Sequence, residues 1–404
     1  MSRILFLARG VPFPPNSGDS IVTYGFVRAL ANRGHDVHLL AYARDDDAET
    51  VPGVRDVCES IVRVEGTESP LPPTARKVAR AALGRSDVME MFDADSMREA
   101  AARRITTLSP DVVVGQHPYL ARAFRDEDVR AAAAWADARL VTSAHVVEFA
   151  AHRLHRATAS DVKTRAELSL EIPRLRREEL ATYQASDRVL VLGERDRRRL
   201  EERVTTPVKR QRVAIDAAEY ETADRPVEGK RLLFFGSYEW FPNEDGVLAF
   251  AEGPWPEIRE VHPDAEFVVA GRDANDAVRS LGERPGITFA GEVEDIGAAV
   301  RDAAVMVTPL RIGGGVRIKI LESMAWETPI VTTRRGFEGV DAEPGEDVLV
   351  ADDWDEFVAG TNRLLSDPEE RKRLAANARE RIETAYAPDD VAAELESNLG
   401  IDGS

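Results

Sequence analysis

The chain has 404 residues, which predicts two or three domains and is long enough to bury two full hydrophobic cores. Its apolar fraction of 43% is typical of a globular protein, and no stretch approaches the roughly 20 apolar residues of a membrane span. The formal net charge of −19 argues against a broad basic face that binds nucleic acid. A single cysteine, Cys58, excludes an internal disulfide framework and a cysteine-rich zinc site.

Only six of the 53 basic residues are lysines. An acidic surface with few lysines is typical of proteins from salt-loving organisms, where carboxylates hold water and salt screens their mutual repulsion. A GC-rich genome also favours arginine over lysine, so both explanations stay open. The apolar run at residues 3–8 is too short for the core of a secretory signal. We therefore expect a cytoplasmic protein whose chain begins with a buried strand.

Strand-like and helix-like segments alternate through the first half, which predicts an α/β fold with parallel sheets. The strand at 3–8 is followed by a loop rich in Gly and Pro, a helix over 21–33 that ends at Gly34, and a strand over 36–42. The loop therefore lies at the carboxyl end of the first strand, where open α/β sheets bind ligands. Further strands are expected at 111–114, 139–144 and 188–192.

A second series of alternating elements starts at residue 231. We expect strands at 232–236, 267–271, 287–291, 305–309 and 329–333, and helices at about 243–260, 295–302, 318–326 and, as a pair, between 367 and 398. The polar stretch 205–230 separates the two series and has the composition of a domain boundary. The pattern predicts two Rossmann-like domains, over 1–205 and 206–385.

The most informative segment is 309–333, with the sequence PLRIGGGVRIKILESMAWETPIVTT. A strand ends here, three glycines follow at 313–315, and a helix opens with Arg317 and Lys319 near its first turn. Glycines let the backbone approach a ligand, and a helix N-terminus offers free N–H groups and a partial positive charge. With the two basic side chains, the segment predicts a phosphate or diphosphate site. The alternative is a plain glycine turn before a solvated helix face.

Two common nucleotide-binding motifs are absent. No G-K-[ST] follows the glycines, so the loop is not a Walker loop, and Gly10 and Gly18 are too far apart for a dinucleotide-binding G-x-G-x-x-G. The acidic runs at 45–47 and 93–95 lie in polar stretches, and we interpret them as solvated surface. We therefore expect no metal site and no cofactor.

The segment GGGVRIKILESMAWETPIVTT resembles the donor-binding signature of the retaining glycosyltransferases of family 4, in the sub-group with a G-G-G-x-R-x-K loop. That signature has two glutamates separated by seven residues. Glu322 matches the second, which holds the ribose hydroxyls, whereas Gly314 replaces the first, which contacts the donor sugar. The resemblance extends over 234–258 and, more weakly, over the first half. It implies a GT-B fold: two Rossmann-like domains facing each other across a cleft, with the C-terminal helix in 386–404 returning to the first.

The resemblance implies a set of site residues. The expected catalytic residues are His145, Arg317 and Lys319, although a hydrogen-bonded histidine at a strand end would explain His145 without a functional role. The expected donor-binding residues are Gly236, Asn243, Gly313, Gly314, Gly315, Val316 and Glu322. On the acceptor and phosphate side we expect Gly18 and His117.

The implied reaction moves a hexose from a UDP- or GDP-sugar to a saccharide, lipid-linked or protein-glycan acceptor, with retention and without a metal. Arg317, Lys319 and the loop amides would stabilise the departing diphosphate. The alternatives are a sugar-nucleotide epimerase, for which no convincing set of acid and base carboxylates is found, and a non-catalytic GT-B-fold protein that binds nucleotide sugars. Residues 74–85 carry basic and apolar residues at helical spacing, so they would contact the inner membrane face or form a solvated helix.

Overall fold

The computed structural model divides the chain into two compact units. The described residues are 1–43, 51–66, 72–92, 95–159, 161–222 and 229–401, so the acidic runs at 45–47 and 93–94 lie outside them. Unit 1 comprises Met1–Ala214 and Pro388–Ser404, and unit 2 comprises Ile215–Ala387. The division comes later than the expected boundary after residue 205, because strand β7 (Val208–Arg210) pairs with the sheet of unit 1.

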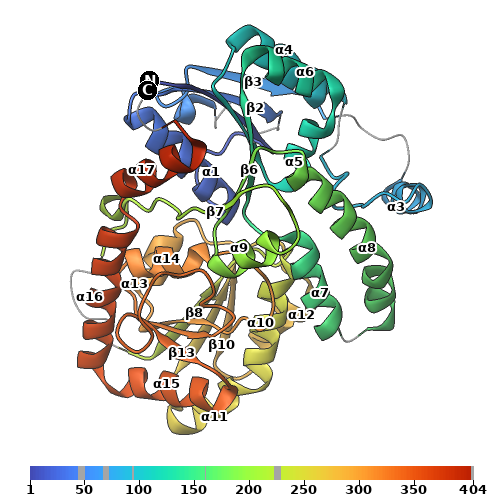
Figure 1. Ribbon diagram of the computed structural model, residues 1–404. Helices are drawn as coiled ribbons and strands as arrows, with labels where there is room; N and C mark the ends of the chain where they lie inside the picture. The colour runs from blue at the N-terminus through green and yellow to red at the C-terminus, as the bar shows by residue number, and fades with distance from the viewer. Residues whose placement is uncertain (44–50, 67–71, 93–94, 160, 223–228, 402–404) are drawn as a thin grey trace. The chain divides into compact units, whose positions relative to one another are not determined.

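Unit 1 is built on a parallel sheet with the strand order β3-β2-β1-β4-β5-β6-β7 (Figure 1). Besides β7, its strands are β1 (Arg3–Ala8), β2 (Asp36–Tyr42), β3 (Ser60–Val64), β4 (Val112–Gln116), β5 (Arg139–Ala144) and β6 (Arg188–Val191). In the central strand β1, Ile4 lies opposite Val37 on one side and Val112 on the other. Strands covered on both faces need continuous apolar runs, which explains why β1 and β2 are evident from the sequence.

The helices of unit 1 connect and cover this sheet. They are α1 (Gly18–Asn32), α3 (Pro73–Ala82), α4 (Asp95–Leu108), α5 (Pro118–Ala121), α6 (Glu127–Ala136), α7 (Glu148–Thr158), α8 (Val162–Gln184), α9 (Glu194–Glu201) and α17 (Pro388–Leu399), with 3-10 turns η1 (Val51–Val54) and η2 (Arg122–Arg125). Helix α1 starts earlier than expected because Ser17 and Ser20 form a capping box. The C-terminal helix α17 packs against α1, as the resemblance implied (Figure 1).

Unit 2 repeats the design with the strand order β10-β9-β8-β11-β12-β13. Its strands are β8 (Arg231–Phe235), β9 (Glu266–Ala270), β10 (Ile287–Gly291), β11 (Val305–Thr308), β12 (Ile330–Thr333) and β13 (Leu349–Ala351). Its helices are α10 (Phe241–Glu252), α11 (Pro254–Val261), α12 (Asp276–Arg279), α13 (Ile296–Arg301), α14 (Ile318–Ala325), α15 (Trp354–Ser366) and α16 (Pro368–Ala385), with turns η3 (Ala217–Glu219) and η4 (Ser280–Glu283). The prediction of one helix over 243–260 is wrong: the helix breaks at Gly253, because Pro254 disfavours a helical conformation in the residue before it.

Each unit has its own apolar core. In unit 2, Phe250 packs edge-on against Phe267 and Phe357, with ring centroids 4.8 and 5.6 Å apart. In both sheets the strand order reverses direction at one place, between β1 and β4 in unit 1 and between β8 and β11 in unit 2. Loops that leave the carboxyl ends of these strands diverge and open a crevice, which is where doubly wound sheets bind ligands.

Candidate functional site

The Gly-rich loop of unit 2 follows β11 at the reversal point of that sheet. Gly313 and Gly315 have φ angles of 113° and 72°, a region that side chains with a Cβ avoid. A Cβ on Gly313 would also lie 2.7 Å from Nη2 of Arg317. The buried Arg317 guanidinium folds back and donates to the carbonyl of Gly314. Arg317 therefore supports the loop from behind.

Lys319 lies one residue into α14 and reaches the carboxyl end of β8. Its Nζ donates to the Phe235 carbonyl at 2.5 Å and to Oδ1 of Asn243 at 2.8 Å, and it lies 4.2 Å from the centre of the Phe234 ring. All three partners are electrically neutral. Burial, and then the charge of Arg317, lowers the pKa of Lys319 to about 7.

Gly236 makes this arrangement possible. A Cβ at this position would lie 2.7 Å from Nδ2 of Asn243 and 2.8 Å from Nζ of Lys319. Asn243 is fixed in turn by a 2.7 Å hydrogen bond from its Nδ2 to the Ser237 carbonyl. The structure therefore brings together Gly236 and Asn243, from the connection between β8 and α10, and Lys319 from α14. Gly271, which sequence reasoning missed, belongs to the same edge, since a Cβ there would lie 1.8 Å from the Gly236 carbonyl oxygen.

Glu322 follows one turn after Lys319 on α14 and is partly exposed. Burial raises the pKa of Glu322 to about 8, and the neighbouring Lys319 opposes the shift only in part. Gly314 and Val316, also expected at the site, are partly exposed in the loop, whereas Gly315 is buried. The edge of unit 2 thus holds a lysine and a glutamate whose pKa values are both shifted toward neutrality.

The two expected histidines of unit 1 lie side by side, with ring centroids 4.1 Å apart. His117 directly follows β4 and has a φ of 66°, and its ring stacks on Tyr119. His145 directly follows β5, and its Nε2 lies 2.8 Å from Oε1 of Gln116. Both histidines are buried, and the Gln116 contact makes His145 a hydrogen-bonded histidine at a strand end.

Asp19 joins these histidines, although sequence reasoning did not single it out. Its Oδ1 lies 2.5 Å from Nε2 of His117 and 3.4 Å from Nδ1 of His145, and its Oδ2 accepts from Nε of Arg9 at 2.6 Å. Burial alone would raise the pKa of Asp19, but His117, Arg9 and His145 together hold it well below its usual range. The expected Gly18 is exposed at the start of the same helix. In the sequence, this pair is marked only by position: Arg9 directly follows the first strand, and Asp19 lies in the first turn of the next helix.

Asp19, His117 and His145 are side-chain types that bind zinc and related metals, and their potential ligand atoms lie within 4.8 Å of one another. In a tetrahedral zinc site with bonds of about 2.0–2.1 Å, ligand atoms lie roughly 3.3 Å apart. The 2.5 Å separation between Asp19 and His117 is a direct hydrogen bond that leaves no room for an ion between those atoms. The geometry as it stands is therefore a hydrogen-bonded cluster.

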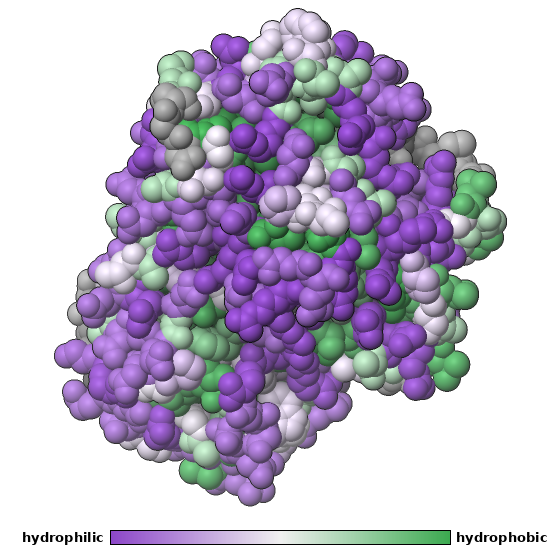
Figure 2. Space-filling model, in the orientation of Figure 1, coloured by the Kyte–Doolittle hydropathy of each residue, from purple (hydrophilic) through white to green (hydrophobic). Residues whose placement is uncertain are grey.

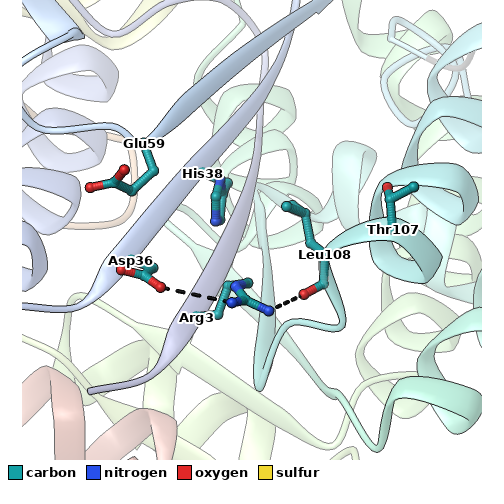
Figure 3. A pocket seen from close by; sticks show the side chains of 6 residues that line it. All are labelled: Arg3, Asp36, His38, Glu59, Thr107 and Leu108. Carbon is teal, nitrogen blue, oxygen red and sulfur yellow. Dashed lines mark hydrogen bonds and ion pairs between the residues drawn. The ribbon is translucent and has the colours of Figure 1, made fainter.

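A cavity of about 310 Å³ opens at the other edge of the unit 1 sheet (Figure 3). It is lined by Arg3, Asp36, His38, Glu59, Thr107 and Leu108. Arg3 and Asp36 are the first residues of β1 and β2, and they face each other at 3.9 Å. Because this edge carries the amino ends of the strands, it is remote from the crevice where parallel sheets place ligands.

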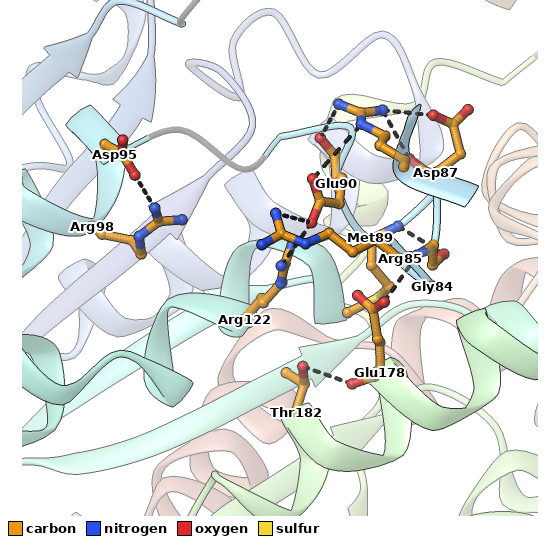
Figure 4. A network of polar contacts seen from close by, with 12 residues as sticks. Gly84, Arg85, Asp87, Met89, Glu90, Asp95, Arg98, Arg122, Glu178 and Thr182 are labelled. Atoms are coloured by element: carbon orange, nitrogen blue, oxygen red, sulfur yellow. Dashed lines mark hydrogen bonds and ion pairs between the residues drawn. The ribbon is translucent and has the colours of Figure 1, made fainter. Parts of the chain in front are cut away.

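The helix expected at 74–85 is α3, which ends at Ala82, and two of its basic residues, Lys77 and Arg80, are paired within unit 1. Arg80 contacts Asp87 at 2.6 Å, and Lys77 contacts Glu167 at 2.6 Å. Arg85, just after the helix, contacts Glu90 at 3.1 Å (Figure 4). Arg122 shares the same Glu90 carboxylate at 2.9 Å. These ion pairs offset part of the positive charge that was expected to attract a membrane.

The surface remains largely hydrophilic in the face drawn in Figure 2, with hydrophobic atoms gathered at α3. Val78 on this helix is 64% exposed, and Leu83 just after it is 71% exposed. No helix among the described residues combines the length and the apolar character needed to cross a bilayer.

Residues 229–367 match the family model described as Glycosyl transferases group 1. This segment contains both the Gly-rich loop and Lys319, and it lies within unit 2.

Two curated proteins match shorter parts of the chain. One is a phosphatidyl-myo-inositol mannosyltransferase of Mycobacterium leprae, 34% identical over 115 residues, which are 28% of this chain and 30% of that protein. The other is an uncharacterized 44.6 kDa protein in the cps region of Klebsiella pneumoniae, 23% identical over 163 residues, or 38% and 42% of the two chains. The matches thus span less than half the length of these relatives.

Solved structures match over nearly the whole chain. Sucrose-phosphate synthase from Thermosynechococcus elongatus superposes with a TM-score of 0.71 at 14% identity, covering 98% of both chains. Anabaena HepE, solved in complex with UDP-glucose, gives 0.68 at 12% identity, covering 99% of this chain and 100% of that one. At these identities the likeness shows the fold. It confirms the expected GT-B class with two parallel-sheet Rossmann-like domains.

Proposed function

We propose that the protein is a glycosyltransferase that moves a hexose from a nucleoside-diphosphate sugar to a saccharide, lipid-linked or protein-glycan acceptor. The observation that carries this proposal is the convergence of Gly236, Asn243 and Lys319 beside a Gly-rich loop, within a segment that matches Glycosyl transferases group 1. The mannosyltransferase match and the HepE complex support a nucleotide-sugar donor, with UDP- and GDP-sugars as the first candidates.

The donor diphosphate would bind at the reversal point of the unit 2 sheet. Lys319 is held there by neutral partners, so an arriving phosphate gains a cationic donor that is already positioned. The backbone amides of the loop and the N-terminus of α14 add partial positive charge. Arg317 would support the loop from behind and add to the positive potential, and Glu322 would hold the ribose hydroxyls.

The chemical step breaks the anomeric bond while negative charge grows on the leaving diphosphate. Fixed positive groups aimed at that charge lower the barrier, because they need no rearrangement as the reaction proceeds. Lys319, Arg317 and the loop amides would serve this purpose without a metal. The resemblance implies retention of the anomeric configuration, with the leaving phosphate accepting the proton of the acceptor hydroxyl on the same face. His145, in unit 1, is the remaining residue that the resemblance implies to be catalytic.

An assay of sugar transfer in the presence of EDTA tests the proposed function directly. Purified protein is incubated with UDP-glucose, UDP-N-acetylglucosamine or GDP-mannose and a panel of glycoside acceptors, and the anomeric protons of the product are observed by NMR. The proposal expects a product with the donor's anomeric configuration, and it expects Lys319→Ala to abolish it. Binding of a nucleotide sugar with no transfer to any acceptor would favour a non-catalytic binding protein, consistent with Gly314 in place of a glutamate.

Membrane contact is a smaller part of the proposal. It rests on exposed Val78 and Leu83, because Lys77 and Arg80 of α3 are engaged with acidic partners. Such a contact would place the protein at the inner membrane face, close to lipid-linked acceptors. Sedimentation with anionic vesicles tests this, and a Val78→Ser and Leu83→Ser double variant is expected to lose the binding.

A further inference from the structure

The cluster around Asp19 has an inner and an outer part. His117 and His145 are the inner part, with side chains only 9% and 6% exposed. Asp19 and Arg9 are the outer part, at 17% and 36% exposed. A ligand that enters the crevice between the carboxyl ends of β1 and β4 would therefore meet Asp19 and Arg9 first, with the histidines behind them.

Asp19 retains capacity to accept a further hydrogen bond. A carboxylate has about four lone-pair sites. His117 is hydrogen-bonded to Oδ1 and Arg9 contacts Oδ2, so among the described contacts one acceptor site on Oδ2 is left over. Arg9 has five N–H donors, and the described contacts, to Asp19 and Tyr119, use two of them. The pair therefore offers an acceptor next to donors.

Charge limits the class of ligand that fits. Arg9 and Asp19 neutralise each other at 2.6 Å, and burial lowers the pKa of His145 well below its usual value. An anion would be repelled by Asp19, and a cation would be repelled by Arg9. An uncharged hydroxyl suits the pair best, because its O–H can donate to Asp19 while its oxygen accepts from Arg9.

We propose that Arg9 and Asp19 form a sugar-hydroxyl binding pair, and that His117 is a positioning residue that holds the Asp19 carboxylate in place, with His145 packed beside it. This inference rests on the proposed glycosyltransferase function for its ligand class. The hydroxyl belongs either to the sugar of the donor or to a sugar of the acceptor, and the two sources share the same chemistry.

Binding measurements with Asp19→Asn distinguish these sources. The variant keeps the size of the side chain but removes its charge and replaces an acceptor oxygen with an amide donor. Asp161→Asn is the matched control, because Asp161 is an exposed N-cap of α8 in the same unit. Calorimetry measures the affinities for UDP, UDP-glucose and a panel of methyl glycosides, and thermal unfolding checks that each variant is folded.

A donor-side role predicts that Asp19→Asn weakens UDP-glucose binding at least tenfold while UDP binding stays within twofold of wild type. An acceptor-side role predicts at least a tenfold loss for the glycoside that wild type binds, with both nucleotides unaffected. Affinities within twofold of the Asp161→Asn control for every ligand would overturn the inference. So would a wild-type protein that binds neither a nucleotide sugar nor a glycoside.

The positioning role is tested separately by His117→Gln. The side chain keeps a donor for Asp19, so a three- to tenfold loss in the same affinity is expected, and ¹⁵N NMR of the remaining His145 is expected to show a changed ring-nitrogen signature. A wild type that binds glycosides through Asp19 but no nucleotide would refute the proposed function and leave this inference standing. If the wild type binds nucleotide normally and Asp19→Asn has wild-type affinity for every ligand, the proposed function stands and this inference is refuted.

Discussion

The two sheets reverse their strand order in the same way, but they treat charge differently at that point. In unit 1, the Asp19 carboxylate is paired with Arg9 and His117, and His145 lies beside them. In unit 2, Lys319 is held by neutral groups, and burial shifts the pKa of both Lys319 and Glu322 toward neutrality. The Asp19 charge in unit 1 therefore has charged partners before any ligand arrives. The described hydrogen-bond partners of Lys319 in unit 2 are uncharged, so an anion would supply its counter-charge.

The sharpest way to break this comparison is to remove the lysine of unit 2. Lys319→Ala is expected to weaken binding of a nucleoside diphosphate by about 2.7 kcal/mol, roughly 100-fold, because a charge-assisted hydrogen bond to phosphate is lost. Calorimetry in EDTA measures the change. Lys230→Ala is the control, since Lys230 pairs with Asp264 on the surface of the same unit and its loss should leave affinity unchanged.

A second change disturbs unit 1 alone. Glu179 accepts hydrogen bonds from the backbone N–H groups of Glu148 and Phe149 and from the Tyr183 hydroxyl, at 2.8, 2.8 and 2.7 Å. Glu179→Ala leaves these three buried donors without their acceptor and should destabilise the protein by about 2 kcal/mol. Chemical denaturation measures this, with Glu167→Ala on the same helix as the exposed control. Nucleotide affinity at unit 2 should not change, and a parallel loss there would contradict separate roles for the two edges.

Gly236→Ala sharpens the comparison without removing a charge. The added methyl group would lie within 3 Å of Asn243 and Lys319 and would displace their side chains, so nucleotide affinity should fall about tenfold, or about 1.4 kcal/mol. Gly360→Ala in α15 is a matched control, because the nearest atom to its Cβ would be 3.5 Å away. If both variants bound nucleotide equally well, the packing of Lys319 against Gly236 would be irrelevant to the ligand.

The smallest expected effect is on pH dependence. Lys319 has a pKa of about 7, which a bound diphosphate raises, so binding takes up a proton and weakens as pH rises above 7. Glu322 has a pKa of about 8, and a ribose bound to its carboxylate lowers it, so this group strengthens binding as pH rises toward 8. The two slopes oppose each other, and wild-type affinity for UDP-glucose should vary little between pH 7 and 8.

Variants separate the two titrations. Affinity of Glu322→Gln should fall severalfold from pH 7 to 8, whereas affinity of Lys319→Met should rise over the same interval. Calorimetry in two buffers of different ionisation enthalpy would show the proton uptake directly. The same slope in both variants would mean that neither group titrates with the ligand.

Much of the fold follows from local sequence, because strands such as β1 and β8 are continuous apolar runs and the helix stop at Gly34 has a φ of 83°. Strands β3 and β7 were missed because they are short edge strands that carry charged residues. The Gly-rich loop was found because its glycines and basic residues are adjacent in sequence. The pairing of Asp19 with His117 was not, because 98 residues separate them and only the strand order brings them together.

We propose that unit 2 binds a nucleoside diphosphate through positioned protein groups without a metal. Calorimetric titration of the wild-type protein with UDP and GDP, first in EDTA and then with added Mg²⁺, measures this binding. We predict one site per chain, with the same affinity for the favoured nucleotide under both conditions. Binding that appears only when Mg²⁺ is added, or no binding under either condition, would contradict it.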